Sequence, residues 1–143
     1  MPITAQEVRR LTVAGGIALF VLVAYWTLWF LARDAVQSAD THAYFDFENA
    51  FPAADAWLGG CVLLAVRAVR RQRPTALLWL LTGGGAGVYL FCMDVLYDLE
   101  HDIYATGAGG IIELGINLLT GGFALWFLRW AWQRRDALLS SPG

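Results

Sequence analysis

The chain has 143 residues, of which 58% are hydrophobic and 15% charged, and its formal net charge is −2. This length allows a single domain over residues 1–143, and the apolar content is typical of integral membrane proteins. Lysine is absent, which excludes a Schiff base. Cys61 and Cys92 form no CxxC pair, which argues against a thiol oxidoreductase and favours two small buried side chains. We expect no nucleic-acid partner.

Four apolar segments predict the fold. They cover residues 11–32, 51–69, 75–97 and 109–132, and each is close to the roughly 20 residues that a helix needs to cross a bilayer. The first is too long for the core of a secretory signal and is expected to be retained. We therefore predict an all-α integral membrane protein, an antiparallel bundle of four transmembrane helices.

Charges sort by sign between these segments. One set of helix ends carries nine arginines against two acids, a net charge of +7: Arg9, Arg10, Arg67, Arg70, Arg71, Arg73, Arg129, Arg134 and Arg135, with Glu7 and Asp136. The opposite ends carry ten acids and Arg33, a net charge of −9. The positive-inside rule places both termini in the cytoplasm and the acidic loops outside. Arginine without lysine suggests a GC-rich bacterial genome, and hence a bacterial plasma (inner) membrane.

Helical spacing places several acids on faces that also carry small residues. In segment 109–132 this stripe contains Gly110, Glu113, Asn117, Gly121 and Ala124. Similar stripes contain Gly84, Gly87, Phe91, Asp94, Asp98 and His101 in the third helix, and Glu48, Pro52, Asp55, Gly59 and Val62 in the second. Small residues mark the faces on which membrane helices pack, so these acids are expected to point into the bundle.

The dipole of each helix separates the acids into two groups. Asp55 and Glu113 lie about one turn into helices that start on the acidic side, where the dipole favours a carboxylate, so a capping role stays an alternative. Asp94 and Asp98 lie at a helix C-terminus, where the dipole opposes them. Helix geometry gives these two no reason to be acidic, which favours a functional role, with Asp94 the central residue.

Carboxylate and amide oxygens from three helices predict a cation site. The expected ligands are Asp94, Asp98, Glu113, Asp55 and Asn117, with His101, His42 and Glu48 as additional candidates. Hard oxygen ligands suit Ca²⁺, Mg²⁺ or Mn²⁺, and a transition metal becomes an alternative if the two histidines take part. The same group of carboxylates can also hold a proton or an organic cation.

Three functions stay open at this stage. The first is a non-catalytic membrane protein whose outward-facing carboxylate cluster binds a cation, for transport or sensing. The second is a membrane enzyme of isomerase or cyclase type, in which Asp94 or Glu113 donates a proton to a lipid or isoprenoid substrate. It requires an apolar pocket below the acids, expected to be lined by Phe91, Tyr89 and Leu118. The third is an accessory subunit of a larger membrane complex.

The bilayer is the expected surrounding in all three cases, and self-association through the glycine faces is compatible with each. Residues 34–49 form a polar outer loop, in which a short interfacial helix is an alternative. The sequence leaves open whether this loop covers the acidic cluster.

Overall fold

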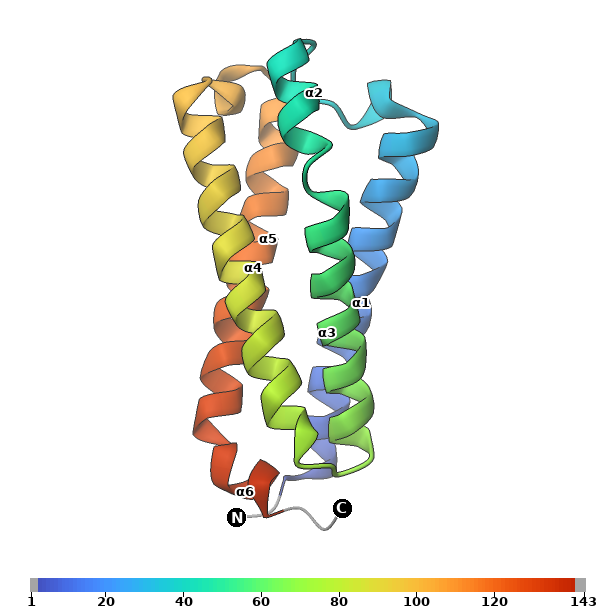
Figure 1. Ribbon diagram of the computed structural model, residues 1–143, viewed down its shortest axis with the longest axis vertical. Helices are drawn as coiled ribbons and strands as arrows, with labels where there is room; N and C mark the ends of the chain where they lie inside the picture. Colours follow the sequence, from blue (N-terminus) through green and yellow to red (C-terminus); the bar gives the residue numbers. More distant parts are fainter. Residues whose placement is uncertain (1–2, 141–143) are drawn as a thin grey trace.

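The computed structural model describes residues 3–140, and this part of the chain contains helices and no strand. Four of its helices are long: α1 (Ala5–Leu31), α3 (Pro52–Arg70), α4 (Thr75–Glu100) and α5 (Ala108–Gln133). The short elements are η1 (Arg33–Ala35), α2 (His42–Glu48), η2 (Ile103–Ala105) and α6 (Arg135–Leu139). The four long helices lie side by side along the long axis, with α2 at one end and α6 at the other (Figure 1).

The predicted all-helical class and the four apolar helices are confirmed. Within residues 3–140 four helical segments are long and apolar enough to cross a membrane, the second of them running from His42 through Arg70. Two of the four long helices extend beyond their predicted bounds by several residues: α1 starts six residues earlier and α4 ends three residues later. The early start of α1 has a local cause, because Thr4 and Glu7 form a capping box.

Glycines allow the helices to approach closely. A Cβ added to Gly83 would lie 3.0 Å from the Cβ of Cys61 on α3, and one added to Gly87 would lie 2.9 Å from the Cβ of Ala124 on α5. On α5, a Cβ at Gly121 would lie 2.8 Å from the Phe91 ring. The glycine-rich middle of α4 therefore packs between α3 and α5, as small residues do in membrane bundles.

The two cysteines differ in exposure. Cys61 is 1% exposed and contributes to the α3–α4 contact. Cys92 is exposed, so the expectation of a buried side chain was wrong for this residue. The reason is rotational: its neighbour Phe91 points at α5, and each further residue turns about 100° around the helix, which carries Cys92 away from the bundle.

An aromatic cluster closes the acidic end of the bundle. Trp29 from α1, Tyr44 from α2 and Ile103 from η2 are at most 3% exposed and form a small core of their own. The indole N–H of Trp29 also donates a hydrogen bond to Asn49, 3.2 Å away. These contacts fix α2 over the bundle, so the segment between α1 and α3 is an ordered cover rather than an open loop.

Candidate functional site

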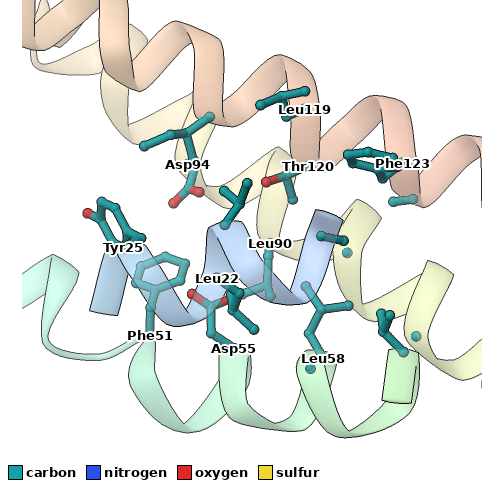
Figure 2. Close-up of a pocket in the computed structure, with 18 of the residues that line it drawn as sticks. Leu22, Tyr25, Phe51, Asp55, Leu58, Leu90, Asp94, Leu119, Thr120 and Phe123 are labelled. Atoms are coloured by element: carbon teal, nitrogen blue, oxygen red, sulfur yellow. The ribbon is translucent and has the colours of Figure 1, made fainter. Parts of the chain in front are cut away.

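A pocket of about 110 Å³ lies inside the bundle below this cover. Most of its lining is apolar, and four carboxylates line it as well: Glu48, Asp55, Asp94 and Glu113. Figure 2 shows Asp94 and Asp55 pointing into the pocket close to Tyr25, whereas Leu58 and Phe123 line its farther part. The pocket thus has an acidic end and an apolar body.

Three of the four carboxylates each accept one hydrogen bond from a neutral donor. The pairs are Tyr25 with Glu48 at 2.9 Å, Trp26 with Asp55 at 2.8 Å, and Ser38 with Glu113 at 2.8 Å. Asp94 accepts no hydrogen bond from any residue that the structure describes. It is therefore the carboxylate of the pocket with the most unused capacity to accept hydrogen bonds.

No arginine neutralises these acids within the described chain. The ion pairs between residues 3 and 140 are Glu7 with Arg134 and Arg135 with Asp136, and both lie at the opposite, basic end. Arg33, the arginine of the acidic side, stacks on aromatic rings instead, with its guanidinium 4.9 Å from the Trp29 ring centre. Burying an unpaired charge is costly, so the pocket favours protonation or a bound cation.

Asp98 and Asn117 form a separate buried network outside the pocket lining. The Asn117 amide donates to Asp98 at 2.7 Å and to the Tyr104 hydroxyl at 2.9 Å, and both buried side chains are at most 3% exposed. The Asn117 carbonyl oxygen has no hydrogen-bond partner among the described residues. Burial raises the pKa of Tyr104 to about 12, so this hydroxyl stays protonated at neutral pH.

Replacing Asn117 by alanine is expected to lower the free energy of unfolding by about 1–3 kcal/mol, because the buried Asp98 would lose one of its two hydrogen-bond donors and keep only Tyr104. Thermal unfolding in detergent measures the change. The matched controls are Asp98→Ala and the double variant, which together give the coupling between the two side chains, expected at about 0.5–3 kcal/mol. Strictly additive losses would show that the hydrogen bond contributes nothing.

Neither histidine joins the pocket. His42 begins α2 and is exposed. His101 is also exposed, and its ring stacks on Tyr97 with the ring centres 4.0 Å apart. The expected lining of the apolar part was wrong as well, because Phe91, Tyr89 and Leu118 do not line it. Tyr89 and Leu118 are 64% and 63% exposed on the outside of the bundle, and the ring of Phe91 packs against Gly121 on α5.

The side chains that donate hydrogen bonds to the carboxylates of the pocket were not identified from the sequence. Tyr25 and Trp26 look like interfacial anchors in an aromatic stretch, and Ser38 lies in a polar loop. A signal was present, since Ala18 lies four residues before Leu22, and Leu22 lies three and four residues before Tyr25 and Trp26, a spacing that places them on one side of α1. Ser38 gave no such signal, because only the folded cover brings it to Glu113.

Residues 3–140 contain no group of three or more His, Cys, Asp or Glu side chains arranged to hold a metal ion. The divalent-cation site therefore stays a prediction. No protein-family model, curated protein or solved structure matches the chain. What the site can do must accordingly be argued from its geometry and charge.

Proposed function

We propose that the chain is an integral plasma-membrane protein, of bacterial origin, that crosses the bilayer four times as an antiparallel bundle. Both termini would lie in the cytoplasm and the covered acidic end would face outward. This orientation is supported by the sign of the charges, with +7 at one set of helix ends and −9 at the other. Exposed leucines, isoleucines and phenylalanines along all four helices supply the surface that lipid would cover.

In this setting we propose that the pocket binds an organic cation, a small protonated amine with an apolar body. The observation that carries the proposal is Asp94, a carboxylate without a hydrogen-bond partner in the described chain that points into an apolar pocket. An ammonium group carries three N–H donors, so it can donate to carboxylates that are spread around a pocket and do not form a single coordination shell. The apolar walls would hold the body of the ligand.

The size of the pocket limits the ligand. A dry protein cavity of roughly 150 Å³ binds benzene, so a pocket of about 110 Å³ suits a body smaller than a benzene ring, such as a short branched chain. Isobutylammonium is a suitable probe, since it joins one short branched chain to one charge. Its neutral isostere is isobutanol, and methylammonium carries the charge without the branched chain.

The test is thermal unfolding of the purified protein in detergent at pH 5 to 8 with each of these compounds and with Ca²⁺, Mg²⁺ and Mn²⁺. Isobutylammonium is expected to stabilise the protein by about 2.7 kcal/mol at a hundred times its dissociation constant, and each partial analogue by less. Stabilisation by a divalent ion alone would favour the metal site. If no cation stabilised the protein between pH 5 and 8, the proposal that the pocket binds a cation would be wrong.

A second candidate function is favoured by the apolar pocket itself. A membrane enzyme acting on a lipid or isoprenoid substrate needs an apolar cavity beside an acid, and Asp94 and Glu113 line such a cavity. Incubation with membrane lipid extract in D₂O provides the test, because protonation of a carbon–carbon double bond places solvent deuterium in the product. Deuterium incorporation by the wild type that is lost in Asp94→Asn would support catalysis, and its absence would exclude this chemistry.

A further inference from the structure

A groove between α1 and α5 lies on the outer surface of the basic half of the bundle. It has a volume of about 730 Å³ and is lined by residues from Gln6 to Ile17 on α1 and from Leu118 to Trp126 on α5. Leu119 and Phe123 line both this groove and the inner pocket, from opposite sides. The groove is thus separate from the carboxylates but shares a wall with their pocket.

The groove has a charged mouth and an apolar floor. Arg9 and Arg10 lie at the mouth, are exposed, and take part in no ion pair within the described chain. Farther along, Val13, Ile17 and Leu118 are 54%, 48% and 63% exposed. Midway along α5, a Cβ added to Gly122 would meet no described atom within 4 Å, so the groove has open space there.

We propose that this groove binds an anionic phospholipid. The phosphate would lie at Arg9 and Arg10, and one acyl chain would follow the apolar floor. Charge complementarity selects this occupant, because two unpaired guanidinium groups attract a phosphate and lie beside apolar surface. From Arg10 to Ile17, α1 rises by about 11 Å, so the floor would follow about two thirds of an acyl chain in a leaflet of roughly 15 Å.

The experiment is native mass spectrometry of the full-length protein. The protein in detergent is first incubated with phosphatidylglycerol, or with phosphatidylcholine of the same acyl chains, and the detergent is then removed in the spectrometer. One phosphatidylglycerol is expected to be retained per chain, in preference to phosphatidylcholine. Glycerol phosphate, which has the charge without the chains, should not be retained. This readout needs no amine ligand, so it can succeed or fail independently of the inner pocket.

Two pairs of variants give the matched controls. Arg9→Gln/Arg10→Gln should weaken phosphatidylglycerol binding by roughly thirtyfold, equivalent to about 2 kcal/mol. Arg70→Gln/Arg71→Gln removes the same charge from the basic α3–α4 connection and should leave binding unchanged. Gly122→Leu fills the groove without removing any charge and should also abolish retention. Gly85→Leu, at a comparably open glycine on α4, should not.

Several outcomes would overturn the proposal. Equal retention of the two lipids, or equal losses in both arginine pairs, would mean that charge attracts lipid without a site. Retention in Gly122→Leu would place the lipid elsewhere. A lipid-free dimer that Gly122→Leu dissociates would show that a second copy of the chain occupies the groove.

Discussion

Replacing Asp94 by asparagine is expected to weaken the binding of isobutylammonium by roughly a hundredfold or more, about 3 kcal/mol. The variant removes the charge of the one pocket carboxylate that no described residue satisfies, while its volume stays nearly the same. Without ligand, the variant should unfold at the same temperature as the wild type or a higher one, because an unpaired charge in an apolar surrounding opposes folding. Isothermal titration and thermal unfolding measure the two effects.

Asp46→Asn is the matched control. Asp46 lies on α2 at the same end of the bundle and carries the same charge, but it is exposed and does not line the pocket. Its replacement should change the affinity by less than about twofold, since charges exposed to water are screened. Equal losses in both variants would mean that the amine responds to the general acidity of this end, and unchanged binding in Asp94→Asn would exclude the pocket as the site.

Replacing Gly110 by alanine is expected to lower the free energy of unfolding by about 2 kcal/mol or more. A Cβ at this position would meet the carbonyl oxygen of Ile103 and would lie 2.7 Å from that of Tyr104. Both atoms belong to the backbone of η2, which cannot turn away as a flexible side chain can. The strain should therefore spread to Tyr104 and its contact with Asn117, and thermal or denaturant unfolding in detergent records the loss.

Gly115→Ala tests whether this loss comes from the close contact. Gly115 lies five residues farther along α5, and its added Cβ meets no described atom within 4 Å. The substitution should be neutral or slightly stabilising, since alanine favours a helix over glycine by up to about 1 kcal/mol. A similar loss at both positions would point to an effect on the helix itself and not on the η2 contact.

Much of the candidate site could be predicted from helical spacing. Glu113, Asn117, Gly121 and Ala124, placed on one stripe by spacing of three and four residues, are all buried in the structure. Helical spacing did not predict burial correctly beyond the end of a helix. By its spacing in the sequence, His101 belongs to the stripe predicted for α4, but it follows the last residue of the helix and is exposed.

The expected five-ligand cluster is divided in two by the structure. Asp55, Asp94 and Glu113 line the pocket together with Glu48, whereas Asp98 and Asn117 bond to each other outside its lining. Spacing along one helix cannot foresee this division, because it depends on how far neighbouring helices are displaced along their axes. That displacement is set by contacts such as Gly87 with Ala124.

The sequence by itself determined the helical class, the four apolar segments and the separation of charge between their ends. These properties follow from composition and from periods of three or four residues, which act within a single segment. Only the tertiary structure decided that residues 34–49 cover the acidic end, that Tyr25, Trp26 and Ser38 hold three of the acids, and that Asp94 has no such donor. Those facts depend on pairs 23 to 75 residues apart, and nothing local in the chain specifies which distant side chain will meet which.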